Sequence, residues 1–238
     1  MKTVVVGATG LTGRFVVLFL LAKKLPVTVF VRSKERMLEL VKDSEHKDLL
    51  TIIEGTVLDV SSEVLEKEVA QADAVVSCLG HNLNLQGMFG KPYRLVTDSL
   101  ERLLTCSSTM SKKKCILMNS EGVFRPGDDV RSRSERMILF LLRHLIVPHA
   151  DNEAAAEYLA SQQHTEDWVG VRPTDLIDAI QSSEYKLYDK PTGSLFGSGE
   201  VSRSNVAQLM VDLLTDSALF AKYKGSFPVV HDGVKEQK

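Results

Sequence analysis

Three glycines, each three residues after the last, follow a short apolar run at the start of the chain, and this spacing constrains the fold more than any other feature. The run, Val4 to Val6, is β-branched and suits a strand buried on both faces of a parallel sheet. The glycines that follow it are Gly7, Gly10 and Gly13. The stretch at 11–24 then predicts a helix. A strand, a tight glycine turn and a helix in this order open a βαβ unit.

The alternation of apolar strands with helices continues along the chain. We expect further strands at 27–31, 51–54, 74–79, 115–119 and 168–171, and helices at 35–42, 62–69, 93–106, 132–147, 152–162 and 204–214. Right-handed crossovers between such units predict an α/β fold, a doubly wound Rossmann-type parallel sheet with helices on both faces. Because no Pro/Gly/Ser-rich linker interrupts the chain, we expect residues 1–232 to form a single domain. Loops and short strands at 173–200 would form a small C-terminal, substrate-side extension, and 233–238 a polar tail.

The charge balance excludes broad classes of partner. The 238 residues include 29 lysines and arginines and 31 acidic residues, so the formal net charge of −2 gives no overall attraction to nucleic acid or to an anionic membrane. The run of lysines at 112–114 is interpreted as a solvated loop. The most apolar stretches, at 15–22 and 137–147, are too short to span a bilayer. We therefore expect neither a nucleic-acid partner nor a membrane partner.

The cysteines and histidines show no metal-ligand pattern. Cys78, Cys106 and Cys115 follow no CxxC or zinc-ligand spacing, and no secretory apolar segment precedes them, so we expect reduced thiols in a cytoplasmic protein. Three histidines titrate near neutrality in principle, but we interpret them as surface or packing residues rather than proton donors. They are His81, His144 and His149. No metal site is predicted.

The glycine pattern has a specific use in a strand–turn–helix unit. The first glycine permits the tight turn, the second lets the backbone approach a pyrophosphate, and the third lets the helix pack closely on the sheet. The first N–H groups of the helix and its dipole then face the anion. The hydroxyls of Thr9 and Thr12 are further donors, although Thr12 is equally suited to cap the helix. The segment therefore predicts a dinucleotide site.

The residues after the second strand indicate which dinucleotide binds. An acidic side chain there would bind the adenosine ribose 2′-hydroxyl, whereas Arg32 and Ser33 present a guanidinium and a hydroxyl to a 2′-phosphate. Arg14 follows the last glycine and is expected on the same side. NADP(H) is therefore favoured over NAD(H) as the cofactor. The alternative is that these arginines are only solvent-facing charges.

Two further strand ends fit a path for the cofactor, because ligands bind beyond the carboxyl ends of such strands. Asp59 and Val60 follow the third strand and are expected to flank the adenine. The small residues at 78–80 end the fourth strand and allow backbone contact with the ribose and nicotinamide side. The alternative for either segment is an ordinary loop. The predicted cofactor-binding residues are Gly7, Thr9, Gly10, Leu11, Thr12, Gly13, Arg14, Arg32, Ser33, Asp59, Val60, Cys78, Leu79, Gly80, Asn119 and Pro173.

Several segments carry a family resemblance when they are taken together. They are GATGLTGR at 7–14, Arg32, Leu-Asp-Val at 58–60, Cys-Leu-Gly at 78–80, Asp151, Ala-Glu at 156–157, the W..VRP..L pattern at 168–176 and VSRSNVA at 201–207. These segments resemble the atypical short-chain dehydrogenases/reductases, and within them the NAD(P)H-binding, NmrA-like group of the biliverdin reductase B/flavin reductase type. The resemblance covers about residues 1–215 and implies the fold and the cofactor.

The resemblance says less about the reaction. The main branch of that superfamily uses a Tyr-xxx-Lys pair, in which the lysine lowers the pKa of the tyrosine so that the phenol passes a proton to the substrate oxygen. In this chain Gln162 stands four residues after Tyr158, and Thr97 stands four residues after Tyr93. Since neither tyrosine has a cationic partner, we expect no proton transfer by an activated tyrosine.

The end of the fifth strand offers the remaining candidate for chemistry. By the resemblance, Ser120 would face the nicotinamide, where its hydroxyl would orient a substrate carbonyl or a flavin, so Ser120 is the predicted catalytic residue. The alternative is that Ser120 closes a turn or bonds the cofactor. Glu121 is a second candidate acid if burial raises its pKa.

An apolar insert follows this strand. Residues 137–147 are largely apolar and end at Pro148, which suggests either core packing or a lid over an apolar substrate. With the cofactor prediction, this favours an NADPH-dependent reductase of a small planar or apolar acceptor such as a flavin, quinone or enone. The alternative is a non-catalytic NADP(H) redox sensor that binds a protein partner. An epimerase or dehydratase of nucleotide sugars fits less well, because such relatives usually carry the tyrosine–lysine pair.

Overall fold

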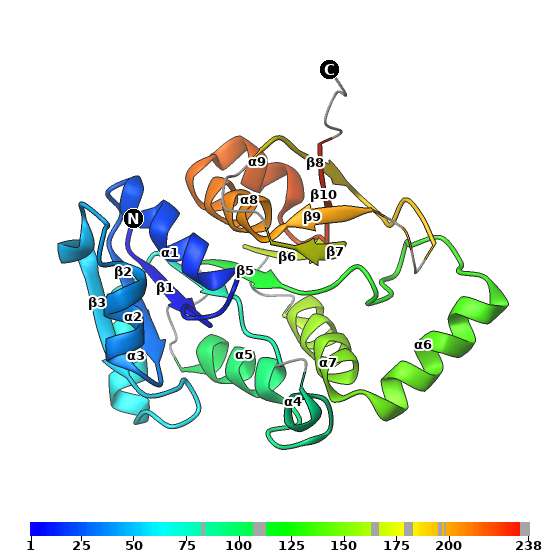
Figure 1. Cartoon of the computed structure of the whole chain (residues 1–238), viewed down its shortest axis with the longest axis horizontal. Helices are drawn as coiled ribbons and strands as arrows, with labels where there is room; N and C mark the ends of the chain where they lie inside the picture. The colour runs from blue at the N-terminus through cyan, green and yellow to red at the C-terminus, as the bar shows by residue number, and fades with distance from the viewer. Residues whose placement is uncertain are drawn as a thin grey trace.

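The computed structural model describes residues 1–81, 84–106, 113–162, 167–178, 183–194, 197 and 199–233. An eight-stranded sheet forms its centre, with helices on both faces (Figure 1). The strands of this sheet are β1 (Thr3–Val6), β2 (Val27–Val31), β3 (Leu50–Glu54), β4 (Ala74–Ser77), β5 (Lys114–Met118), β6 (Trp168–Pro173), β8 (Tyr185–Tyr188) and β10 (Val229–Asp232). The helices of the described part are α1 (Gly13–Ala22), α2 (Lys34–Leu40), a 3-10 turn (Lys47–Leu49), α3 (Ser62–Ala70), α4 (Leu85–Phe89), α5 (Leu95–Thr105), α6 (Arg133–Leu145), α7 (Val147–Ser161), α8 (Arg203–Thr215) and α9 (Ser217–Tyr223). A separate parallel pair consists of β7 (Asp175–Ile177) and β9 (Glu200–Ser202).

The strand order of the central sheet is β3-β2-β1-β4-β5-β6-β10-β8. Neighbouring strands from β3 to β10 are parallel, and β8 runs antiparallel to β10. The first six strands thus have the doubly wound order of a Rossmann sheet, in which the direction of growth reverses between β1 and β4. The predicted fold class is confirmed.

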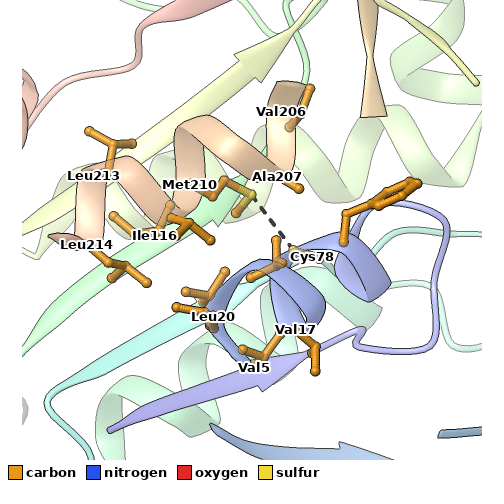
Figure 2. Packing of buried hydrophobic residues seen from close by; sticks show 14 of the residues in the cluster. Val5, Val17, Leu20, Cys78, Ile116, Val206, Ala207, Met210, Leu213 and Leu214 are labelled. Atoms are coloured by element: carbon orange, nitrogen blue, oxygen red, sulfur yellow. Dashed lines mark hydrogen bonds between the residues drawn. The ribbon is translucent and has the colours of Figure 1, made fainter. Parts of the chain in front are cut away.

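The strands have apolar residues on both faces because each face is covered by helices. On β1, Val5 belongs to the cluster formed with α1 and α8, whereas Val4 and Val6 belong to a cluster with α3 and α5. Figure 2 shows the first cluster, in which side chains of α1 and α8 meet over the sheet. The Sγ atom of Cys78 lies in this cluster, 3.8 Å from Sδ of Met210. The N-terminal β-branched run therefore contributes to both cores.

The apolar insert forms two helices that meet beside Pro148. Helix α6 ends at Leu145 and α7 begins at Val147, so the helix predicted at 152–162 starts earlier than expected. A proline fits the first turn of a helix, because its missing N–H would have had no partner there. Helix α6 projects away from the sheet in Figure 1 and contains no buried residue. The core-packing interpretation of this insert is therefore wrong, and Met137 and Phe140 are exposed.

Two lysines of the basic run form hydrogen bonds with the C-terminal ends of helices. Nζ of Lys113 donates to two carbonyl oxygens at and just beyond the end of α3, and Nζ of Lys114 donates to two in the last turn of α8. Cations are favoured at helix C-termini because the carbonyl groups there lack partners and carry partial negative charge. The interpretation as a solvated loop is therefore wrong for these two lysines. Lys112 lies outside the described residues.

Four short elements of the described part were not predicted from the sequence, namely the 3-10 turn at Lys47–Leu49, α4, α9 and β10. Helix α9 begins after Asp216, whose carboxylate accepts the N–H groups of Ala218 and Leu219 at 2.8 and 3.0 Å. Strand β10 pairs with β6 and β8, which lie far away in the sequence. Such pairing depends on distant segments rather than on a local pattern. The extension at 173–200 contains the short strands that were expected there.

The three cysteines are free thiols whose protonated form makes them weak nucleophiles. Cys78 and Cys115 are buried and free, and burial raises the pKa of both thiols to about 12. Burial likewise raises the pKa of the free thiol of Cys106, to about 11. The protonated form therefore dominates near neutral pH. Among the described residues, no helix has both the length and the apolar character needed to cross a membrane.

Candidate cofactor-binding site

The turn between β1 and α1 requires its glycines. Gly7 has a φ of +74°, in the left-handed region, and a Cβ there would lie 2.5 Å from the backbone oxygen of Cys78. A Cβ on Gly13 would overlap the backbone of Gly7, so the first turn of α1 packs directly on the start of the loop. The N–H of Gly10 donates to the carbonyl oxygen of Gly7 at 3.0 Å. The spacing of the glycines therefore reflects close backbone contacts.

The start of α1 has no side-chain cap. Thr12 precedes the helix and is buried, but its side chain makes no capping hydrogen bond, so the alternative that Thr12 caps the helix is wrong. The first N–H groups of a helix have no partner within the helix. In this chain the N–H groups of Arg14 and Phe15 donate to the carbonyl oxygens of Gly10 and Thr12, so the helix dipole is what favours an anion at this end.

A cavity of about 710 Å³ opens at the carboxyl ends of β1, β2, β3 and β4. Its volume falls in the range of small-molecule and cofactor sites. The wall combines the β1–α1 turn with the loops that follow the next three strands and with part of α5. The predicted cofactor-binding residues in this wall are Gly7, Thr9, Gly10, Arg32, Asp59, Cys78, Leu79 and Gly80.

The remaining predicted residues lie outside the cavity wall. The hydroxyl of Ser33 accepts the N–H of Arg36 at 3.1 Å and thereby caps α2. The side chain of Asn119 donates to the carbonyl oxygen of Asn152 at 2.9 Å and ties β5 to α7. Pro173 is buried at the end of β6. The predicted residues outside the wall are Leu11, Thr12, Gly13, Arg14, Ser33, Val60, Asn119, Ser120 and Pro173.

Two guanidinium groups line the cavity near the end of β2. Arg32 follows the strand and is exposed, and Arg36 lies in the first turns of α2, where its Nη2 donates to the carbonyl oxygen of Thr9 at 3.4 Å. The sequence prediction missed Arg36. Its position in the first turn of the helix that follows the second strand could have indicated that its side chain reaches the same site as Arg32. Arg14 does not join the two arginines, because its guanidinium lies 4.8 Å from the ring centroid of Phe15 and outside the wall.

The loop after β3 contributes both polar and apolar side chains to the cavity wall. The hydroxyl of Thr56 donates to Oδ2 of Asp59 at 2.5 Å, which fixes the carboxylate at the cavity. The apolar side chains of Val57 and Phe30 line the same region. A carboxylate beside apolar groups suits a flat base with polar edges. Val60 lies outside this wall.

Ser120, the predicted catalytic residue, closes a turn after β5. Its Oγ accepts the N–H of Gly122 at 3.2 Å, and its own N–H donates to Oδ1 of Asn119 at 2.9 Å. Ser120 is half-buried and does not line the cavity. The structure therefore shows the turn-closing alternative, and a role at the nicotinamide stays a prediction.

His81 occupies a place that the sequence interpretation did not anticipate. It follows Gly80 directly and lines the cavity, and its Nε2 lies 2.7 Å from Oδ2 of Asp151. Its side chain is only 4% exposed, so of the two predicted alternatives, a surface or a packing residue, His81 matches the second. His144, in contrast, is exposed on α6. Over the residues that the structure describes, no group of three or more histidine, cysteine or acidic residues could hold a metal ion.

Several solved structures share this fold over nearly the whole chain. A protein from Lactobacillus casei has a TM-score of 0.76 at 18% sequence identity, with 98% of this chain and 100% of that one covered. A short-chain dehydrogenase/reductase from Veillonella parvula, in complex with NADP, has a TM-score of 0.71 at 19% identity, with 97% and 94% covered. An anaerobilin reductase from Escherichia coli has a TM-score of 0.69 at 16% identity, with 100% of both chains covered. At these identities the likeness shows the fold.

The sequence itself shows the family. No curated protein matches the chain. The family model described as NAD(P)H-binding matches residues 7–217, a range that includes the glycine turn, both cavity arginines and the pair of His81 and Asp151. This match confirms the resemblance indicated by the motifs, and the chain belongs to the NAD(P)H-binding family.

Proposed function

We propose that this protein is an NADPH-dependent reductase of a small planar or apolar acceptor, such as a flavin, a quinone or an enone. The observation that carries the proposal is one continuous cavity, whose wall joins the glycine turn, two guanidinium groups and the end of β4. The turn fits a pyrophosphate, because Gly7, Thr9 and Gly10 line the cavity just before the start of α1. The same wall offers a place for each half of a dinucleotide.

The preference for NADPH over NADH rests on Arg32 and Arg36. Both line the cavity at the end of β2, where an acidic side chain would bind the 2′-hydroxyl of NAD. A guanidinium forms charge-assisted hydrogen bonds with a phosphate, so two of them favour the phosphorylated ribose. The similar structure from Veillonella parvula holds NADP, which supports this choice.

The acceptor class follows from what surrounds the β4 side of the cavity. Leu79, Pro92 and Leu95 contribute apolar surface there, which suits a planar or apolar molecule. The cofactor itself supplies the hydride, so the protein has to position the acceptor and exclude water. One of the similar structures is an anaerobilin reductase, which supports a reductive role.

The experiment that tests the proposal combines binding with turnover. Fluorescence titration should show tighter binding of NADPH than of NADH, and NADPH should be oxidised, measured by its absorbance, when FMN, a quinone or a cyclic enone is added. Binding of NADPH without oxidation by any of these acceptors would contradict the reductase proposal and favour the redox-sensor alternative. Equal affinity for the two cofactors would contradict the NADPH preference.

A further inference from the structure

A buried histidine–aspartate pair borders the cavity on the side of β4. His81 stands directly after Gly80 at the end of β4, and Asp151 lies in α7. Their side chains meet with Nε2 and Oδ2 2.7 Å apart, at exposed fractions of 4% and 0%. His81 also lines the cavity, so the pair lies at the cavity wall.

The surroundings of Asp151 fix the orientation of the imidazole ring. Its carboxylate accepts the N–H groups of Val96 and Thr97 at 2.7 and 3.0 Å, and the hydroxyl of Thr97 at 2.6 Å. Burial would raise the pKa of Asp151, but the hydrogen bonds from His81, Thr97 and Val96 outweigh it and lower the pKa below its ordinary value. An ionised carboxylate can only accept, so Nε2 of His81 carries the proton in this bond. Nδ1 is then the ring nitrogen left for a ligand.

The position of His81 in the sheet places it on the side of the second nucleotide. Strand β4 pairs with β1 on the edge opposite to β2. A dinucleotide with its 2′-phosphate at Arg32 and its pyrophosphate on the β1–α1 turn extends across the switch point towards β4. Among the described residues, Nδ1 of His81 has no hydrogen-bond partner within the protein.

Resting on the proposed reductase function, we propose that His81 is the proton donor of the reaction and that Asp151 is its positioning residue. The acceptor gains a hydride, with both electrons, from NADPH, which leaves as NADP⁺. The atom of the acceptor that becomes anionic takes the proton from Nδ1 of the imidazolium ring, and an N–H bond breaks as the new O–H, N–H or C–H bond forms. The neutral ring keeps the proton on Nε2, which stays hydrogen-bonded to Asp151, and Nδ1 recovers a proton from water.

This role takes the place of the missing tyrosine–lysine pair. In that pair a lysine lies beside the tyrosine that donates the proton, whereas here a buried carboxylate orients the imidazole ring through Nε2. The fold does not depend on His81 alone at this point. The carboxylate of Asp151 also accepts three hydrogen bonds from the start of α5, and these remain when the histidine is replaced. A substitution of His81 should therefore leave the fold intact.

The test compares His81→Asn and His81→Ala with His144→Ala, a matched control on the exposed helix α6. His81→Asn should lower kcat for NADPH oxidation by about 10²- to 10⁴-fold, the usual effect of losing a general acid. The dissociation constant for NADPH should stay unchanged, and added imidazole should restore turnover to His81→Ala. His144→Ala should leave both quantities as in the wild type.

A measurement that does not depend on turnover accompanies the kinetics. The ring signals of His81 in NMR spectra of the wild type, assigned by their loss in His81→Asn, should shift when NADP⁺ is added. An unshifted ring would overturn the placement of His81 beside the cofactor. Thermal unfolding of each variant verifies the fold. If neither variant folds, the solvent isotope effect on NADPH oxidation by the wild type tests the inference. Proton donation predicts slower turnover in D₂O than in H₂O, and equal turnover in the two solvents would contradict it.

The outcomes separate this inference from the proposed function. A wild type that turns over and a His81→Asn variant that turns over equally well would overturn the proton-donor role and leave the reductase proposal standing. A variant with weakened NADPH binding, unchanged kcat and no response to imidazole would assign the ring to cofactor binding and overturn the inference as well. A wild type that oxidises NADPH with none of the acceptors would overturn both.

Discussion

Arg32 and Arg36 bring two positive charges to one wall of the cavity, although one follows a strand and the other belongs to a helix. Arg36 is held in place through its hydrogen bond to the carbonyl oxygen of Thr9, which links α2 to the glycine turn. Arg32 and Arg36 are both exposed. The pair therefore brings two accessible cations, one of them bonded to the glycine turn, to the proposed 2′-phosphate site.

We expect Arg32→Ala and Arg36→Ala each to weaken NADPH binding and to leave NADH binding nearly unchanged. A charge-assisted bond to phosphate contributes on the order of 1.5–3 kcal/mol, which corresponds to a loss of about 10- to 150-fold in affinity. Fluorescence titration with both cofactors measures the change. Lys34→Ala is the matched control, because it removes a neighbouring charge whose side chain does not line the cavity. An equal loss of NADPH affinity in Lys34→Ala would show that the effect comes from the net charge of the surface and not from a specific contact with the 2′-phosphate.

At the scale of elements, the contact between α6 and α7 depends on ionisation. Arg143 of α6 donates to both carboxylate oxygens of Glu153 in α7, at 2.6 and 2.8 Å. Burial alone would raise the pKa of Glu153, but the neighbouring His149 and Arg143 outweigh it and lower the pKa to about 2. Since α6 has no buried residue, this pair is a polar contact that holds α6 against α7.

The lowered pKa predicts a loss of stability in acid. The unfolded chain takes up a proton on Glu153 near the ordinary pKa of 4.5, and the folded chain only near 2, so the stabilisation present above pH 4.5 is lost as the pH falls towards 2. The expected contribution is on the order of 1 kcal/mol, because Arg143 is largely exposed. Urea unfolding of the wild type and of Glu153→Gln at about pH 6 and about pH 3 measures it.

The variant should lose part of the pH dependence of the free energy of unfolding. Glu39→Gln is the control, because Glu39 pairs with Lys42 on the open surface, with both side chains more than half exposed. That control should keep the pH dependence of the wild type. The same slope in Glu153→Gln and the wild type would show that the pair does not contribute.

At the scale of the whole molecule, the cavity lies where the sheet changes its direction of growth. Strands β2 and β4 pair with opposite edges of β1, so the loops that follow them diverge and leave space above the turn. The cavity wall is assembled from segments that extend from Val6 to Ser99. Binding in this space should therefore connect the loops that follow four strands.

We expect NADPH to stabilise the folded chain as a whole. A ligand that binds only the native state adds about 2.7 kcal/mol at a concentration one hundred times its dissociation constant. Thermal unfolding with and without NADPH should show an increase of several degrees in Tm. NADH at the same concentration should give a smaller increase. A Tm that does not respond to NADPH would contradict binding at this site.

Local patterns in the sequence were sufficient for the sheet and for one part of the site. The spacing of Gly7, Gly10 and Gly13 after an apolar run specifies the turn, because each glycine meets backbone atoms at close range. The alternation of strands and helices specifies the doubly wound order. Arg32 and Asp59 were found because strand ends in such a sheet meet at one edge.

The remaining features were decided by the tertiary structure. His81 and Asp151 are far apart in the sequence, and only the packing of α7 beside the end of β4 forms their buried pair. The run at 137–142 in helix α6 has the apolar composition of a core segment, but the place of α6 outside the sheet leaves it without a buried residue. The sequence by itself determined the glycine turn and the NAD(P)H-binding fold, because these follow from short-range backbone geometry. The tertiary structure decided which side chains border the cavity, because that depends on contacts between distant segments.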